Sequence, residues 1–143
     1  MPNRKIRSIV EGQTVLALSG DTTVVDAARR MADAHVGSVL VLAGGRLAGI
    51  FTERDALNRV LAKGVDPKAT RLDAVMTPNP LTVHPDKPLG HALHMMFEGG
   101  FRHVPVVEDG RPIGMVSARD ALGLELVEFE HELEQRDEIT ERL

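Results

Sequence analysis

The chain has 143 residues, of which 43% are apolar, a formal charge of −4 at pH 7 and no cysteine. This length allows one domain, or two very small ones that share an interface. The composition excludes disulfides and thiolate chemistry, and no apolar run approaches the roughly 20 residues of a membrane span. We therefore expect a protein of the cytoplasm that does not act at a membrane.

The charge is distributed unevenly along the chain. Residues 125–143 contain eight acidic residues and two arginines, so the remainder has a slight excess of positive charge. Such a weak balance, in a chain without Tyr or Trp to stack on bases, argues against a nucleic-acid binder.

An internal repeat is the most informative feature of the sequence. Residues 21–57 and 86–122 align without a gap at an offset of 65 and are identical at 12 of 37 positions. Unrelated sequences would share about two or three. Two copies are too few for a solenoid, so we predict that they face each other across a pseudo-twofold axis. The predicted parts are a first repeat (6–63), a connection (64–75), a second repeat (76–124) and an acidic amphipathic helix (125–143).

Each copy has the same predicted elements, βαββα. In chain order, a short strand at 15–18 precedes an amphipathic helix that begins at residues 21–23. Two apolar runs around a glycine-containing turn, 39–42 and 47–51, are typical of a β-hairpin, and a second helix begins at Thr52. The second copy has strands at 81–83, 104–107 and 112–116, and a helix that begins at Ser117. The predicted fold class is α+β, with small sheets that carry helices.

A partial apolar stripe continues after the repeats in an otherwise charged stretch. Its members are Leu126, Phe129, Leu133, Ile139 and Leu143. So narrow a stripe usually needs a partner. Three arrangements remain open: a helix that folds back on its own chain, a helix that packs on a second subunit, or a frayed tail.

The residues with the clearest chemistry lie where each hairpin ends. Residues 49–55 and 114–120 share the string Gly-x-x-Thr/Ser-x-Arg-Asp. A hydroxyl followed three residues later by a carboxylate is a variant of the capping box, which needs no ligand. However, the glycine permits close backbone approach and the arginine suits phosphate. A helix N-terminus with both groups can hold a phosphate, and an aspartate can accept both ribose hydroxyls, which together describe a nucleotide monophosphate.

The sequence resembles a tandem pair of cystathionine β-synthase (CBS) domains. The resemblance rests on these two strings, on Arg-His-Val-Pro-Val-Val at 102–107 and on Val-Met-Thr-Pro at 75–78, and it covers roughly residues 6–127. It implies a disc-like pair of repeats with two clefts. Each cleft would bind an adenosine-containing ligand such as AMP, ADP, ATP, NAD or S-adenosylmethionine, not as a catalytic cofactor. It also implies a homodimer.

In this family each cleft takes residues from both repeats, so the resemblance implies two crossed sets. The aspartate would bind the ribose, the Thr or Ser and the arginine would contact the phosphate, and strand residues would flank the adenine. The first set is Thr52, Arg54, Asp55, Thr77, Thr82, His103 and Val104. The second set is Gly12, Ala17, Ser38, Val39, Ser117, Arg119 and Asp120. Gly-Ser-Val-Leu at 37–40 replaces Arg-His-Val-Pro at 102–105, so one phosphate partner is missing and the clefts should differ in affinity.

Histidines are the remaining candidates for metal binding or base catalysis. His91 and His94 lie three residues apart on a predicted helix, but no cysteine or carboxylate constellation completes a site, and we predict no metal. His103 is either a strand residue at the start of a hairpin or a ligand contact, and the resemblance favours the contact. We find neither a Ser-His-Asp arrangement nor carboxylates paired for acid–base work, so we expect no enzyme.

Two functions remain. The first is a sensor that binds an adenine nucleotide and passes a change of shape or of dimer packing to an unidentified effector protein. The alternative is a ligand-independent scaffold whose capping boxes are only structural and whose acidic C-terminal helix recruits a partner. We expect the sensor.

Overall fold

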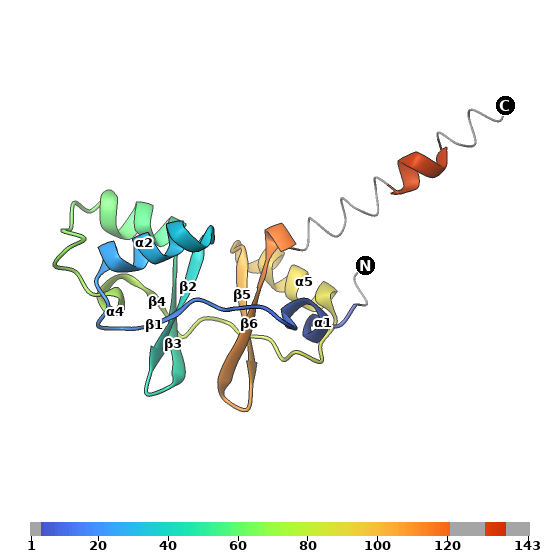
Figure 1. The fold of residues 1–143 in the computed structure, drawn as a ribbon, viewed down its shortest axis with the longest axis horizontal. Helices are drawn as coiled ribbons and strands as arrows, with labels where there is room; N and C mark the ends of the chain where they lie inside the picture. The colour runs from blue at the N-terminus through green and yellow to red at the C-terminus, as the bar shows by residue number, and fades with distance from the viewer. Residues whose placement is uncertain (1–3, 121–130, 137–143) are drawn as a thin grey trace.

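The computed structural model describes residues 4–120 and 131–136. Two repeats lie side by side, and each is a small sheet that carries helices (Figure 1). The first comprises β1 (Ala17–Ser19), α2 (Val24–Ala34), β2 (Ser38–Ala43), β3 (Arg46–Thr52), α3 (Glu53–Asp55) and the π-helix η1 (Ala56–Leu61). The elements that follow are α4 (Leu72–Val75), β4 (Thr77–Pro78), α5 (Leu89–Gly99), β5 (His103–Glu108) and β6 (Arg111–Ser117). The predicted α+β fold of two repeats is confirmed.

A β-hairpin forms the centre of each repeat, as predicted. β2 pairs antiparallel with β3, and β5 pairs antiparallel with β6. Both pairs have an irregular register at equivalent positions, 41/42 and 106/107. The two turn residues, 44–45 and 109–110, all have positive φ. Gly-Gly and Asp-Gly favour this backbone in two-residue hairpin turns, which explains why these sequences form the turns.

The strands at the edges of the hairpins are short. β1 lies parallel to β2, whereas its counterpart, predicted at 81–83, is a single bridge between Val83 and Val106. β4 begins the second half of the chain but pairs antiparallel with β3 of the first repeat. The segment between the repeats therefore completes the sheet of the first one.

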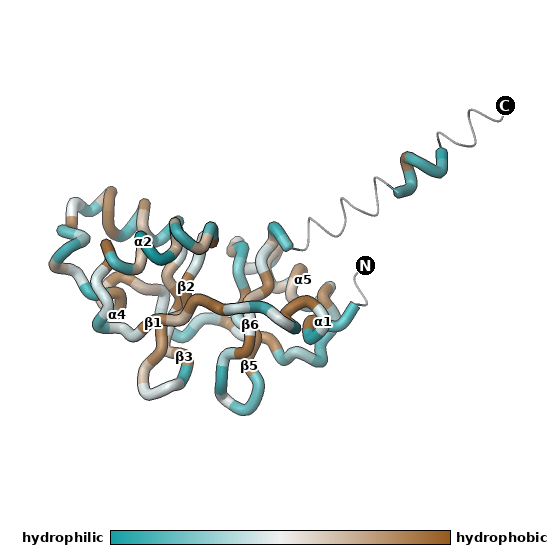
Figure 2. The backbone as a smooth tube through the Cα atoms, in the orientation of Figure 1, coloured by the Kyte–Doolittle hydropathy of each residue, from teal (hydrophilic) through white to brown (hydrophobic). Residues whose placement is uncertain are grey.

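Each repeat has its own apolar core. Val24 and Met31 of α2 pack against Val39, Val41 and Phe51 of the first hairpin. Figure 2 shows apolar residues concentrated on the strands, whereas the turn between β5 and β6 is hydrophilic. Two of the residues assigned to the connection by the sequence, Leu72 and Val75, also belong to this first core.

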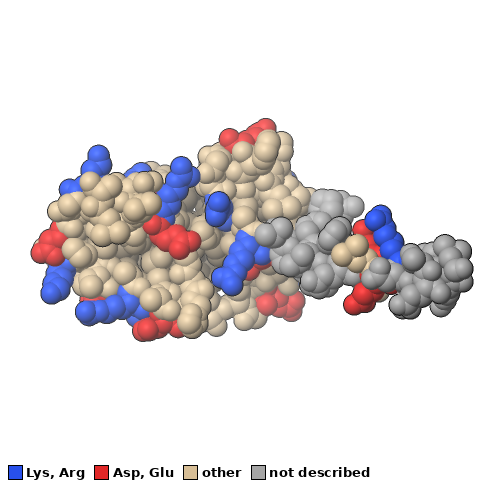
Figure 3. All heavy atoms as spheres, turned by 90° about the horizontal axis from the view of Figure 1, so that it is seen from above, with Lys and Arg blue, Asp and Glu red and all other residues tan. Residues whose placement is uncertain are grey.

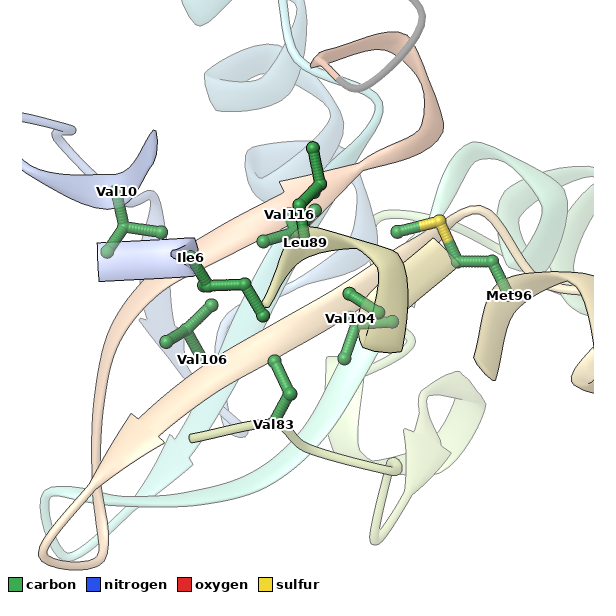
Figure 4. Close-up of a cluster of buried hydrophobic side chains, with 9 residues drawn as sticks. Ile6, Val10, Val83, Leu89, Met96, Val104, Val106 and Val116 are labelled. Atoms are coloured by element: carbon green, nitrogen blue, oxygen red, sulfur yellow. The ribbon is translucent and has the colours of Figure 1, made fainter. Parts of the chain in front are cut away.

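The N-terminal helix α1 (Ile6–Val10) was not predicted. Ile6 and Val10 are buried among Val83, Leu89 and the other residues of the second core (Figure 4). The backbone of α1 is held there too, because the Ile6 N–H donates to the Lys87 carbonyl at 3.0 Å. The domain boundaries given above stay a prediction, but α1 itself packs on the second repeat.

The Arg7 side chain fastens α1 to the same repeat from outside. Its guanidinium donates hydrogen bonds to Asp86 and to both oxygens of Glu108. These bonds hold the pKa of each of the two carboxyl groups below its usual range.

The C-terminal part of the chain is described only in part. Residues 131–136 are helical and exposed, and the rest of the helix predicted at 125–143 lies outside the described residues. How that helix packs therefore stays a prediction. In residues 4–120 and 131–136, no helix has the length and apolar character that a membrane span requires.

Candidate functional site

Both predicted capping boxes are present. The Thr52 hydroxyl accepts the Asp55 N–H at 3.2 Å, and the Asp55 carboxylate accepts the Thr52 N–H at 3.0 Å. Ser117 and Asp120 make the same two bonds at 3.0 and 3.3 Å. These bonds satisfy backbone donors at the start of each helix. They leave the side-chain hydroxyl and the side-chain carboxylate of each box next to the place where a ligand of the helix N-terminus would lie.

A pocket of about 940 Å³ opens between the two repeats. Four residues of the second predicted set line it together, namely Ser38, Ser117, Arg119 and Asp120. His103, assigned to the first set, lines the same pocket. The remaining lining residues are Gln13, Thr14, Val15, Leu16, His35, Val36, Gly37, Glu53, Arg102, Met115 and Ala118. Seen from above, basic side chains lie around the junction between the repeats (Figure 3).

Three residues of the second set do not line the pocket. Gly12 and Ala17 lie on either side of the 13–16 segment that does. Val39 is 1% exposed and belongs to the first core, so its side chain contributes packing. The sequence did not identify segment 13–16 or the acidic wall residue Glu53, because segment 13–16 carries no motif and Glu53 is the variable position inside the string.

The register of the second hairpin accounts for the position of His103 in the pocket. It begins β5 directly opposite Ser117, the last residue of β6. Burial of the imidazole lowers its pKa, and the Arg102 charge acts in the same direction. The carboxylates of Glu53 and Asp120 oppose this shift without cancelling it. Burial therefore favours the neutral form of His103, which lies on the same wall as the second capping box.

Gln13 binds the segment 13–16 to the second hairpin. Its side-chain oxygen accepts the Met115 N–H at 2.9 Å, and its side-chain nitrogen donates to the Met115 carbonyl at 3.0 Å. On the other repeat, the backbone of Thr77 and Pro78 pairs with the equivalent residues of β3. A side-chain amide thus replaces a strand along the edge of β6.

The first predicted set is brought together only in part. The Thr77 hydroxyl lies 3.2 and 3.4 Å from the two oxygens of Asp55, which is in turn bonded to Thr52. Arg54 donates instead to the Gly100 carbonyl at 3.1 Å. Thr82 is exposed, and Val104 is fully buried in the second core.

Two groups of residues with metal-binding side chains lie close together in the described part of the chain. On α5, His94 pairs with Glu98 at 3.0 Å, and both side chains are 67% exposed. His84, Asp86 and Glu108 offer ligand atoms within 4.8 Å of one another, a cluster that the sequence did not reveal. The Arg7 guanidinium already bonds both of these carboxylates and supplies the positive charge there.

The model of the CBS domain matches residues 7–62 and again residues 72–126. The chain belongs to the CBS-domain family. It carries two CBS domains in tandem, and such pairs are regulatory modules.

Among curated proteins, the CBS domain-containing protein CBSCBSPB2 of Arabidopsis thaliana is 42% identical over 108 residues. The match covers 75% of this chain and 20% of that protein, so the chain spans about a fifth of the relative's length. Another relative, the mitochondrial CBS domain-containing protein CBSX3 of the same plant, is 36% identical over 120 residues, which are 80% of this chain and 58% of that protein.

Solved structures have the same fold. A CBS-domain containing protein of Agrobacterium tumefaciens superposes with a TM-score of 0.77 at 27% identity, over 85% of this chain and 98% of that one. The CBS domain pair of protein MJ0100, solved in complex with 5-methylthioadenosine and S-adenosyl-L-methionine, superposes with a TM-score of 0.79 at 24% identity. That alignment covers 89% of this chain and 99% of the MJ0100 chain, and at this identity it shows the fold alone.

Proposed function

We propose that this CBS pair is a sensor that binds an adenine nucleotide in the pocket between its repeats and signals to a partner protein. The observation that carries the proposal is the second capping box. It presents a hydroxyl, a carboxylate and an arginine, from Ser117 to Asp120, to a pocket that also has apolar walls. A nucleotide needs these three kinds of group for its phosphate, ribose and base.

Each part of the ligand has suitable partners in the pocket. Asp120 is exposed and keeps acceptor capacity for two ribose hydroxyls. The Ser117 hydroxyl and the Arg119 guanidinium lie at the start of a helix, where a phosphate is stabilised. Apolar surface for a purine comes from Val15 and Leu16 of the N-terminal segment, from Val36, which follows the end of α2, and from Met115 of β6.

The proposed ligands are AMP, ADP, ATP and NAD. Arg102 and Arg119 both line the pocket and are both exposed, so two guanidinium groups are available to phosphate oxygens. The fold is compatible with this class, because the MJ0100 pair binds two adenosine-containing ligands. Since the pocket has walls from both repeats, a ligand would favour one relative arrangement of the repeats, which is what a sensor requires.

A thermal-shift titration with each nucleotide tests the proposal. A ligand present at 100 times its Kd stabilises the native state by about 2.7 kcal/mol. For a chain of this size that raises Tm by roughly 5–10 °C. The informative variant is Asp120→Asn, because an asparagine oxygen can still accept the Ser117 N–H while the negative charge is lost.

The matched control is Asp109→Asn, an exposed residue of the second hairpin turn. Its backbone has a φ of 54°, which Asn adopts as readily as Asp. We expect nucleotide to raise the Tm of the wild type and of Asp109→Asn, and to have little effect on Asp120→Asn. No shift with any nucleotide at millimolar concentration would refute the sensor and favour the scaffold that recruits its partner through the acidic C-terminal helix.

We also propose that the chain forms a homodimer. Phe97 on α5 is 87% exposed, and Leu57 and Leu61 on η1 are 58% and 73% exposed. Large apolar side chains that stand free on helices are common at interfaces between subunits. Sedimentation of the wild type and of Phe97→Glu and Leu61→Glu would reveal dissociation, and a monomeric wild type at micromolar concentration would exclude the dimer.

A further inference from the structure

The capping box of the first repeat is occupied by the protein itself. Asp55 is 8% exposed, whereas the equivalent Asp120 is exposed. The Thr77 hydroxyl contacts both oxygens of Asp55, and the Arg59 guanidinium lies 3.5 Å from one of them. A carboxylate has about four acceptor positions, and the Thr52 N–H already uses one. Little capacity remains for the two hydroxyls of a ribose.

The arginine of the same string is engaged as well. Arg54 donates to the carbonyl of Gly100, the C-cap residue that follows α5. The last carbonyls of a helix have no partner within the helix and carry partial negative charge, which a guanidinium stabilises. This bond joins the first repeat to the second, and the bond between Thr77 and Asp55 joins the string to the segment between the repeats.

The second repeat differs at one decisive position. The offset of 65 that relates the repeats places Gly12 where the first capping box has Thr77. Glycine has no hydroxyl, and within the described part of the chain Asp120 is bonded only to its own helix start at Ser117. Arg119 has no hydrogen bond or ion pair among the described residues. The groups that are engaged in the first repeat are therefore available in the second.

We propose that the first-repeat string is a latch between the repeats and not a ligand site, so that each chain binds a single nucleotide, in the pocket of Asp120. The latch also positions one pocket wall, because Glu53 lies inside the string and its N–H donates to the Gly37 carbonyl at 3.0 Å. The count of one ligand rests on the proposed function, whereas the latch is a property of the unliganded protein.

Calorimetric titration of the full chain with ADP tests the single site. We expect one ADP per chain in the wild type. Asp120→Asn should weaken binding at least tenfold, since a charge-assisted pair of hydrogen bonds is lost. Thr77→Val removes only the hydroxyl from the latch, and it should keep one ADP per chain with a Kd within about threefold. Two ADP per chain, of which Asp55→Asn removes one, would overturn the proposal.

A double-mutant cycle without ligand tests the latch independently. Thr77→Val and Asp55→Asn should each lower the folding equilibrium constant about tenfold, as expected for a hydrogen bond to a charged group. Because they break the same contact, the double variant should lose little more than either single one. Strictly additive losses, or a Thr77→Val protein as stable as wild type, would overturn the latch. If Asp55→Asn does not fold, Thr77→Val decides alone, since it leaves the capping box intact. Failure of every nucleotide to bind would refute the proposed function but would not alter the outcome of the cycle.

Discussion

Gln13 connects the N-terminal segment to the pocket through one side chain, and its removal is the most direct test of how the pocket is held. In Gln13→Ala the N–H and the carbonyl of Met115 both lose their partner. Each such bond contributes about 0.5–1.5 kcal/mol net, so the two together contribute about 1–3 kcal/mol. For a chain of this length the corresponding decrease in Tm is roughly 3–10 °C.

Urea denaturation followed by far-ultraviolet circular dichroism measures this effect. Gln13→Glu is the informative second variant, because a carboxylate can accept the Met115 N–H but has no proton to donate to the Met115 carbonyl. We expect its stability to lie below that of the wild type and near that of Gln13→Ala. Glu11→Ala is the control, since Glu11 is an exposed residue of the same segment and should change stability by less than about 0.5 kcal/mol. Wild-type stability in Gln13→Ala would refute the view that this amide replaces a strand.

Two further predictions concern the pocket and the N-terminal helix. Because burial lowers the pKa of His103, the unfolded chain binds more protons than the folded one between the folded pKa and about 6.5. The free energy of unfolding should therefore decrease as the pH decreases through this range, and it should decrease less in His103→Gln. Urea midpoints of the wild type and the variant that change equally between pH 7.5 and pH 5.5 would contradict this. In Gly114→Ala the new methyl group would overlap the side chain of Val10. We expect α1 to shift at a cost of about 1–3 kcal/mol, and a variant as stable as wild type in the same assay would show that α1 is not tightly packed.

The repeat made most of the fold predictable. Its period placed both hairpins and the helices before them, because apolar runs, glycine turns and the helical spacing of apolar residues are local signals. The short helix at Ile6–Val10 has no such signal, since five residues are too few to show a period. Its position depends on contacts with Leu89 and Val83, far away in the sequence. Local patterns in the sequence therefore could not predict this helix or its packing on the second repeat.

The candidate site was predictable to a similar degree. The string at 114–120 identified the helix start that faces the pocket, because hydroxyl, arginine and carboxylate are visible in the sequence. His103 was assigned to the other set, since a sequence alone does not show that its strand begins opposite Ser117. Gln13 was missed for a related reason, because one amide that imitates strand pairing leaves no pattern in the sequence.

The two strings show why a motif does not by itself identify a binding site. Thr-Glu-Arg-Asp at 52–55 and Ser-Ala-Arg-Asp at 117–120 make the same two capping bonds, so their local structures are equivalent. The difference comes from another segment, which supplies a hydroxyl at Thr77 to one carboxylate and only the backbone of Gly12 at the equivalent position of the other. In the proposed site, a hydroxyl that donates to the aspartate would take the place of a ribose hydroxyl, because both make the same kind of bond. We therefore expect the residue 22 positions after the first aspartate, rather than the string itself, to decide whether the carboxylate bonds to its own protein or is available to a ligand.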